Sequence, residues 1–316
     1  MKNTCSTLLL LAGLFTAVSA FLPARHSEIS AEGLGEILFE DKMLSLDQSI
    51  SCASCHIPAF AFSDTSAVSL GVGGQKGTRN TPAITNMASR ASFFLDGRAY
   101  TLEQQVLQPI ENPVEMALPL PVALERLRSS AQYQGYFRAV YGQQPDSVNL
   151  ASALAAFVRT LETGATPFDR WMNGNETAMN TAAVRGRQVF MKKGKCFDCH
   201  FGPDFTGDEF RNIGLFDGRA RNDTGRFGIS KDSSDMGRFK VPGLRNVAVS
   251  GPYMHDGSFR TLREVIDYYD QPAKFVPHSI NRDTLLARPL GLTEQEKIDL
   301  EAFLRALTDD RFVERK

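Results

Sequence analysis

Two short runs of cysteine and histidine carry the clearest chemistry in this sequence. Both have the order Cys-x-x-Cys-His, and their members are Cys52, Cys55 and His56 in the first run and Cys196, Cys199 and His200 in the second. Two thiols on one helical turn can each form a thioether with a haem vinyl group, and the adjacent imidazole can then bind the iron. This spacing is the attachment signature of c-type haem. The sequence therefore predicts two covalently bound haems, each with a histidine ligand.

The same cysteines allow other chemistry, which the pattern favours less. A redox dithiol does not need a following histidine, and a zinc site would need a second pair of ligands close by. An even number of cysteines in an exported protein also suggests disulfides. Because both runs carry the histidine, haem attachment is the favoured interpretation.

The sequence around the first run repeats around the second with a constant offset of 160 residues. The matched pairs are Pro82 and Pro242, Asn86 and Asn246, Asp96 and Asp256, Gly97 and Gly257, Thr101 and Thr261, and Leu102 and Leu262. The same offset pairs Pro109 with Tyr269. A tyrosine oxygen can bind haem iron, whereas proline has no side-chain donor atom. We therefore expect an open sixth position at the first haem and a Tyr269 ligand at the second. The alternative ligands of the second haem are Tyr268, Met254, Met236 and His278.

The first half carries a segment after Pro109 that has no counterpart after Tyr269. Residues 110–116 contain Glu111 and Glu115, which places two carboxylates near the expected open face. Cleavage of a peroxide at an open iron needs an acid/base that takes a proton from one oxygen and returns it to the other. The segment therefore predicts peroxide chemistry at the first haem.

The elements that must hold these groups are also duplicated. A short amphipathic segment opens each half, at residues 35–39 and 186–190, and leads into the haem motif. Each half ends with the same apolar helix pattern, at residues 154–161 and 300–307, and this spacing makes one buried stripe. Strand-like alternation is nearly absent. The expected fold is all-α, with two cytochrome c-like domains in tandem, each with one covalently bound haem.

The N-terminal residues have the features of a cleaved export signal. Lys2 precedes a short apolar stretch, and Val18-Ser19-Ala20 is a small-residue cleavage site. Export would place the protein in the periplasm. The expected divisions of the chain are a signal peptide at residues 1–20, the domain of the first haem at 21–165 and the domain of the second at 166–316. No apolar run is long enough to span a bilayer.

Further motifs resemble those of the bacterial di-haem cytochrome c peroxidases and the related MauG-type enzymes, in the same order. They are Phe62-Ser63-Asp64, Asn80-Thr81-Pro82, Asp96-Gly97-Arg98, Glu103-Gln104-Gln105, Glu115-Met116, Phe239-Lys240-Val241-Pro242, Leu244-Arg245-Asn246 and Pro252-Tyr253-Met254-His255-Asp256-Gly257. The resemblance covers nearly the whole mature chain. It implies a peroxidatic first haem and a second haem that receives electrons from an external donor.

The resemblance also implies roles for individual residues. Matching positions assign Glu115 as the catalytic acid/base and Gln105 as the amide of the distal pocket. Glu111, which has no such match, is interpreted as a solvated neighbour of Glu115. A calcium site between the haems is implied as well, because a hard cation prefers oxygen ligands. Its expected ligands are Asn80 and the backbone carbonyls of Ser250 and Pro252.

Three positions depart from the peroxidase pattern. Val72 stands where the peroxidases carry a histidine that caps the first haem, and Tyr269 stands where they carry methionine. Both differences resemble the MauG branch. Leu95 replaces the tryptophan between the haems, which weakens the family's usual route for electron transfer.

The leading hypothesis is a peroxidase that reduces hydrogen peroxide with electrons from a small periplasmic cytochrome c or copper protein. The first alternative is a MauG-like enzyme that oxidatively modifies a partner protein. The second is a non-catalytic electron-transfer cytochrome with two six-coordinate irons. Lys and Arg number 35 against 36 Asp and Glu, so nothing indicates a nucleic acid partner. A homodimer is compatible with the sequence.

Overall fold

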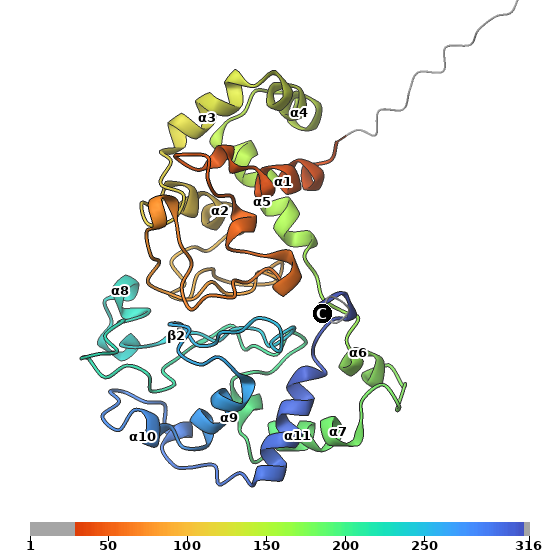
Figure 1. Cartoon of the computed structure of the whole chain (residues 1–316), viewed down its shortest axis with the longest axis vertical. Coiled ribbons are helices and arrows are strands. Elements are labelled where there is room, and N and C mark those ends of the chain that lie inside the picture. Colours follow the sequence, from red (N-terminus) through yellow and green to blue (C-terminus); the bar gives the residue numbers. More distant parts are fainter. Residues whose placement is uncertain (1–28, 313–316) are drawn as a thin grey trace, which may run out of the picture.

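The computed structural model describes residues 29–312, which form two domains, one above the other in Figure 1. The expected signal peptide at residues 1–20 lies outside the described residues. The helices of the first domain are α1 (Ala31–Glu40), α2 (Leu102–Glu111), α3 (Leu120–Ser129), α4 (Ala131–Tyr141) and α5 (Ser147–Thr160). Those that follow are α6 (Pro167–Met172), α7 (Thr181–Met191), α8 (Phe227–Ser230), α9 (Leu262–Asp270), α10 (Pro272–Phe275) and α11 (Glu294–Arg305).

Short 3₁₀ helices and one pair of strands complete the described part. The 3₁₀ helices are η1 (Lys42–Leu44), η2 (Cys52–Ser54), η3 (Pro58–Phe60), η4 (Val72–Gly74), η5 (Cys196–Asp198), η6 (Ser233–Asp235), η7 (Thr284–Leu286) and η8 (Asp310–Phe312). Strand β1 (Phe210–Arg211) pairs antiparallel with β2 (Phe239–Lys240). The expectation of a helical fold is confirmed, and this short ladder is the strand content of the described residues.

The duplicated Thr-Leu pairs mark the start of equivalent helices. The Thr101 hydroxyl accepts a hydrogen bond from the Gln104 backbone N–H at 3.1 Å, and it caps α2. The Thr261 hydroxyl accepts one from Glu264 at 3.2 Å, and it caps α9. A capping hydroxyl satisfies an N–H group that the helix leaves without a partner. The repeat in sequence is therefore a repeat of helix starts.

Each domain is built on a crossing between an early helix and a late one. Helix α1 packs on α5, and α7 packs on α11. A Cβ atom on Gly35 would lie 2.0 Å from the Ala153 carbonyl oxygen, and one on Gly186 would lie 1.8 Å from that of Asp299. Only glycine permits so close an approach of two backbones. Both halves therefore use the same contact to join the helices that flank the haem motif.

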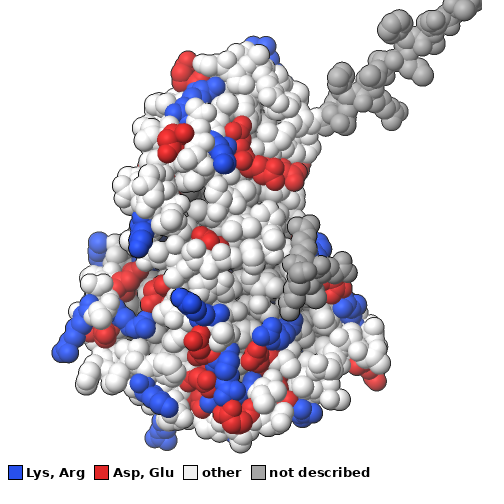
Figure 2. All heavy atoms as spheres, in the orientation of Figure 1, with Lys and Arg blue, Asp and Glu red and all other residues white. Residues whose placement is uncertain are grey.

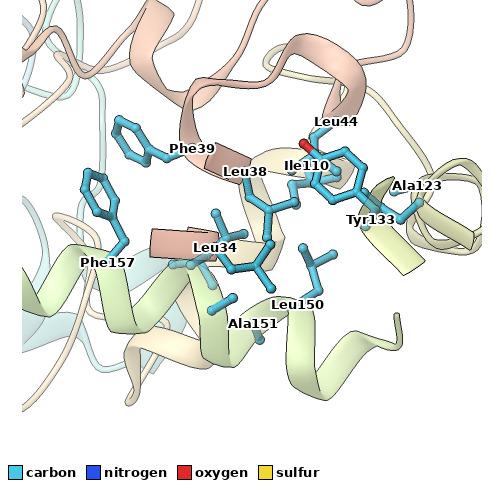
Figure 3. Close-up of a cluster of buried hydrophobic side chains, with 14 of the residues drawn as sticks. Leu34, Leu38, Phe39, Leu44, Ile110, Ala123, Tyr133, Leu150, Ala151 and Phe157 are labelled. Carbon is cyan, nitrogen blue, oxygen red and sulfur yellow. The ribbon is translucent and has the colours of Figure 1, made fainter. Parts of the chain in front are cut away.

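Separate apolar cores fill the two domains. In the first, Leu34 and Leu38 of α1 meet Ile110 of α2 and Leu150 of α5, all fully buried (Figure 3). The hairpin of α3 and α4 covers this core, whereas the described residues between α9 and α11 form only the short helices α10 and η7. The second core is more aromatic, and its rings include Phe168, Phe190, Phe205 and Phe303.

Loops from the two domains meet through polar contacts. Arg79 of the first domain pairs with Asp223 of the second, with Nε 2.6 Å from Oδ2. The Leu95 carbonyl oxygen accepts a hydrogen bond from the Lys240 backbone N–H at 2.8 Å. These contacts hold the two domains against each other between the haem motifs.

The surface of the second domain carries charges of both signs. Basic and acidic side chains are interspersed over it on the face in Figure 2. Within residues 29–312, no helix combines the length and the apolar character that crossing a membrane requires.

Candidate active site

The two Cys-x-x-Cys-His runs fold as the same tight turn, in η2 and in η5. The His56 backbone N–H donates to the Cys52 carbonyl oxygen at 2.9 Å, and the His200 N–H donates to that of Cys196 at 2.8 Å. The four thiols of these turns are free. The disulfide alternative is therefore wrong for these four cysteines.

The two histidines present the same ring nitrogen for a ligand. Nδ1 of His56 donates to the Phe62 carbonyl oxygen, and Nδ1 of His200 donates to that of Phe205, both at 2.9 Å. Because a carbonyl oxygen only accepts, each Nδ1 carries the proton and each Nε2 has a free lone pair. Burial lowers the pKa of both imidazoles, which favours the neutral form that binds metal. Each ring could therefore bind a haem iron through Nε2.

The thiols do not have the properties of a zinc site or a redox dithiol. Burial raises the pKa of Cys52 and of Cys196 to about 12, whereas both alternatives need thiolates near neutral pH. No group of three or more His, Cys, Asp or Glu residues within 29–312 is arranged to hold a metal ion. Neutral thiols beside an imidazole with a free Nε2 fit covalent haem attachment better.

Glu115 lies in the turn after α2 and close to the first haem motif. Its Oε1 accepts a hydrogen bond from Nδ2 of Asn112 at 2.6 Å. Burial raises the pKa of the Glu115 carboxyl, while this hydrogen bond and the charge of Arg98 act in the opposite direction. The Glu115 charge in turn raises the pKa of the Cys52 and Cys55 thiols, so the carboxylate lies near both. Glu111, in contrast, is exposed and accepts a backbone hydrogen bond through Oε1.

Helix α2 presents Gln105 and Pro109 on one face, because they are one helical turn apart. Both residues are half-buried. The Met116 backbone N–H donates to the Pro109 carbonyl oxygen at 3.2 Å, which folds the segment after α2 back against the helix end. Gln105, Pro109 and Glu115 therefore come from one helix and the turn that follows it.

A loop at Gly71 packs closely on the same turn. A Cβ atom on Gly71 would lie 2.3 Å from the Val114 carbonyl oxygen and 2.6 Å from that of Glu115. Val72 follows, at the position where the related peroxidases carry the capping histidine. The loop that lacks this histidine is thus in direct contact with the residues around Glu115.

The two adjacent tyrosines of α9 have different surroundings. Tyr268 is fully buried, and its hydroxyl donates to the Ile213 carbonyl oxygen at 2.7 Å. Burial raises the pKa of Tyr269, and the charges of Tyr268, Cys199 and Cys196 add to the shift, so Tyr269 lies beside the second haem motif. The Tyr268 oxygen is committed to the backbone. Tyr269 is therefore the better placed of the two to bind iron.

The other candidate ligands are less well placed. His278 is exposed, and Met236 lies in a turn whose carbonyl accepts a hydrogen bond from Asn212 at 2.9 Å. Met254 packs against the same apolar cluster as Tyr269, so it remains a neighbour of the second site. None of these three residues lies on α9, the helix that corresponds to α2 and carries Tyr269.

Asn80 joins the first domain to the loop expected to complete a calcium site. Its Nδ2 donates to the carbonyls of residues 66 and 67 at 3.2 Å each, which leaves Oδ1 as the atom that can bind a cation. Its backbone N–H donates to the His255 carbonyl oxygen at 2.8 Å. Because His255 closely follows Ser250 and Pro252 in sequence, this bond brings Asn80 to the loop that carries both expected carbonyl ligands.

Leu95, which replaces the inter-haem tryptophan, lies at the contact between the domains. Its carbonyl bonds to Lys240, and the ring of the adjacent Phe239 stacks on His255 with 3.9 Å between ring centroids. Aromatic rings are therefore present at this contact even without the tryptophan.

Comparisons with known proteins agree with this arrangement. Residues 30–177 match the di-haem cytochrome c peroxidase family, and residues 183–308 match the cytochrome c family. The methylamine utilization protein MauG of Methylorubrum extorquens is 39% identical over 278 residues, which cover 87% of this chain and 77% of that protein. The chain belongs to the di-haem cytochrome c peroxidase family.

Other relatives of this family member carry the peroxidase name. The cytochrome-c peroxidase IdrP1 of Denitromonas iodatirespirans is 36% identical over 306 residues, which cover 87% of this chain and 80% of that protein. This chain is therefore an oxidoreductase of the peroxidase type, and it is built from two tandem cytochrome c-like domains. The names of its relatives include both peroxidase and MauG.

Solved structures show the same architecture. A MauG-like protein associated with microbial copper homeostasis superposes with a TM-score of 0.80 at 32% identity, covering 89% of this chain and 92% of that one. The diheme peroxidase BthA of Burkholderia thailandensis superposes with a TM-score of 0.79 at 24% identity, covering 90% of this chain and 87% of that one. The second likeness shows the fold alone.

Sequence reasoning missed two side chains that act on Glu115. Asn112 holds the carboxylate by a hydrogen bond, and its position as the C-cap of α2, three residues earlier, was an available signal. Arg98 lowers the pKa of Glu115 by its charge. The motif Asp96-Gly97-Arg98 was visible in the sequence. Whether the Arg98 guanidinium comes near Glu115 depends on the path of the loop before α2.

Proposed function

We propose that this family member reduces hydrogen peroxide to water at a haem held by Cys52, Cys55 and His56. In this proposal, electrons enter through a second haem, held by Cys196, Cys199 and His200. They come from a small periplasmic donor, either a cytochrome c or a copper protein. The chain would reach the periplasm by export and removal of residues 1–20.

One observation carries this proposal: α2 and α9 start from equivalent threonine caps, yet they carry different residues at the same helix position. Pro109 on α2 has no atom that can bind iron, whereas Tyr269 on α9 does. The structure supports the assignment of Tyr269 because the Tyr268 hydroxyl is bonded to Ile213. The first haem would then be open to an oxidant and the second closed.

The haem iron at the open site would supply the coordination position and the electrons for cleavage of the O–O bond. Glu115 would take a proton from one peroxide oxygen and return it to the departing oxygen, which leaves as water. Asn112 would keep the Glu115 carboxylate oriented by donating to Oε1. Each turnover consumes two protons and two electrons and yields two waters from one hydrogen peroxide.

The test is the rate of reaction with peroxide. Stopped-flow mixing of the oxidised holoprotein should show a fast reaction that falls by roughly 10²- to 10⁴-fold in Glu115→Gln. Glu111→Gln is the matched control, because Glu111 is exposed on the same segment, and it should react like the wild type. Equal rates for Glu115→Gln and wild type would remove Glu115 from the mechanism.

A second candidate function has specific support. Val72 in place of a capping histidine and Tyr269 in place of methionine both favour MauG-like oxidation of a partner protein, and MauG proteins are among the relatives. Leu95 weakens this alternative, because oxidising equivalents would lack the usual bridge. Steady consumption of peroxide with a reduced cytochrome c or copper protein would favour the peroxidase. A single turnover with either donor would favour the modifying enzyme.

A simple electron carrier would behave differently from both enzymes. It would have two six-coordinate, low-spin irons, and the optical spectrum of the oxidised protein reports this directly. We expect a high-spin component from the first haem, because α2 offers Pro109 at the ligand position. A wholly low-spin spectrum would support the carrier.

A further inference from the structure

A partly buried ionic cluster joins α9 to α11 in the second domain. Nζ of Lys297 on α11 lies 2.8 Å from Oδ1 of Asp267 and 2.9 Å from Oδ2 of Asp270, both on α9. Lys297 is 7% exposed and Asp270 is 2% exposed, whereas the Asp267 side chain is 33% exposed and also pairs with Arg263. Lysine and aspartate are rarely buried to this extent unless they are paired. We call these three residues the α9 clamp.

The first domain makes the same helix contact with apolar side chains at the three corresponding positions, while an exposed ion pair between Glu103 of α2 and Arg159 of α5 lies elsewhere along it. The offset of 160 residues pairs Asp267 with Leu107 and Asp270 with Ile110. The late helices α5 and α11 are related by an offset of 146 residues, as the crossing contacts at Ala153 and Asp299 show, and this offset pairs Lys297 with Ala151. Ile110 and Ala151 are buried in the first core (Figure 3), and Leu107 packs against it. The helix pair can therefore pack with apolar side chains at all three positions.

This internal comparison separates packing from positioning. Replacing a buried ion pair by apolar residues of suitable shape is often neutral or stabilising, because the charges lose their hydration when they are buried. Salt bridges and hydrogen bonds, unlike apolar contacts, constrain the direction of the groups that they join. The clamp is therefore expected to add little stability beyond what the apolar version supplies, and to restrict how α9 sits on α11.

The residues on either side of Tyr269 are tied to their surroundings. The Tyr268 hydroxyl donates to the Ile213 carbonyl oxygen at 2.7 Å. Oδ1 of Asp270 accepts a hydrogen bond from the Leu292 backbone N–H at 3.0 Å, in addition to its pairing with Lys297. The last turn of α9 is thus held from both sides of Tyr269, in the domain where the iron would need a ligand from this helix. The first domain offers Pro109 there and has no clamp.

We propose that Lys297, Asp267 and Asp270 are positioning residues that hold the last turn of α9 so that the Tyr269 hydroxyl stays in place as the axial ligand of the second haem. This inference rests on the proposed Tyr269 ligation. It assigns the clamp to ligand geometry rather than to stability, and it explains why only one of the two domains carries it.

The test converts the clamp into its counterpart in the first domain. The variant Lys297→Ala/Asp267→Leu/Asp270→Ile is compared as oxidised holoprotein with wild type and with Tyr269→Phe. The low-spin signal of the second haem is measured by electron paramagnetic resonance, and the melting temperature is measured in parallel. A second variant, Lys297→Met/Asp267→Asn/Asp270→Asn, keeps the side-chain volumes and is measured if the first does not fold.

The matched control is Arg185→Ala. Arg185 lies on α7 and pairs with Asp299 of α11, with NH2 2.7 Å from Oδ1, so its pair joins α11 to α7 instead of α9. We expect the clamp variant to melt close to wild type and to lose part of the tyrosine-ligated low-spin signal, while Arg185→Ala keeps all of it. Tyr269→Phe should lose the signal completely.

The outcomes separate this inference from the function on which it rests. If Tyr269→Phe loses the signal but the clamp variant keeps all of it, the positioning role is wrong and the ligand assignment stands. If Tyr269→Phe keeps the signal, the ligand assignment fails and the inference fails with it. If Arg185→Ala loses as much signal as the clamp variant, the effect is general loosening of α11 and the positioning role is again wrong.

Discussion

The backbone N–H of Val72 donates a hydrogen bond to the carbonyl oxygen of Glu115, with 2.8 Å between nitrogen and oxygen. This bond ties the loop at residues 71–77 to the turn that carries the proposed acid/base. The position of the Glu115 carboxylate therefore depends on a loop that is distant in sequence, as well as on α2. Changes in the loop can be used to move Glu115 without replacing it.

We expect Gly71→Ala to reduce both stability and peroxide reactivity. The new Cβ would lie 2.3 Å from the Val114 carbonyl oxygen, and neither backbone can yield without displacing the turn at Glu115. Overpacking of this kind typically costs about 1–3 kcal/mol. Calorimetry and stopped-flow rates measure the two effects. Gly77→Ala, on the same loop, is the control because its Cβ would come no closer than 3.4 Å to another atom. Wild-type behaviour of Gly71→Ala would show that the loop does not support Glu115.

The rate of reaction with peroxide should rise with pH through the pKa of Glu115. The carboxylate must be ionised to accept a proton, and burial raises its pKa above the ordinary 4.5. The hydrogen bond from Asn112 lowers this pKa, so Asn112→Ala should move the midpoint of the pH profile to higher pH. Asn112→Asp should move it further in the same direction, because a second negative charge disfavours ionisation. An unchanged midpoint in both variants would contradict this assignment.

The glycines at the two helix crossings should be equally intolerant of substitution. Gly35→Ala and Gly186→Ala would each force a Cβ into a backbone carbonyl, at 2.0 and 1.8 Å, so we expect each domain to lose about 1–3 kcal/mol of unfolding free energy or more. Gly135 lies within α4 and a Cβ there would meet no atom within 4 Å. Gly135→Ala should therefore stabilise the protein by about 0.5–1 kcal/mol. Chemical denaturation measures all three, and tolerance of both crossing substitutions would disprove the shared contact.

Arg79→Met should weaken the contact between the domains. Arg79 bonds to Asp223 of the second domain and to Asp96 of its own, at 2.6 and 2.7 Å. Loss of hydrogen bonds to charged groups of this kind costs about 1–3 kcal/mol. Calorimetry should show a lower melting temperature and separation of the two domain transitions. Arg170→Met, which breaks an exposed pair with Asp310, should cost less than about 1 kcal/mol. Equal effects of the two variants would argue against a special role for Arg79.

We propose that Asn80 binds a calcium ion through Oδ1, so removal of calcium should lower the melting temperature. A ligand that binds only the folded protein stabilises it by mass action. Return of calcium after chelation should restore the melting temperature of the wild type. Neither chelation nor return of calcium should change the melting temperature of Asn80→Ala. Return of magnesium is the comparison, because its smaller octahedral shell suits backbone carbonyls less well. A melting temperature that is independent of calcium in the wild type would remove this site.

The sequence alone identified much of this protein, because the decisive patterns are local or repeat at a fixed offset. The Cys-x-x-Cys-His spacing depends on one helical turn, and the Thr-Leu repeat marks the starts of α2 and α9. Those features were enough to predict two helical cytochrome c-like domains, and the order of the further motifs, from Phe62-Ser63-Asp64 to Asp256-Gly257, indicated the family. The contrast between Pro109 and Tyr269 was also visible, since it needs only the offset.

Only the tertiary structure decided which side chains act together. The offset favours Tyr269 over Tyr268, but only the structure shows that the carbonyl of Ile213, far along the chain, accepts the Tyr268 hydroxyl. The bond between Val72 and Glu115 and the clamp of Lys297 on α9 likewise join segments whose approach no local pattern records. Side-chain identity sets what a residue can bind, but long-range packing determines what lies within reach of it.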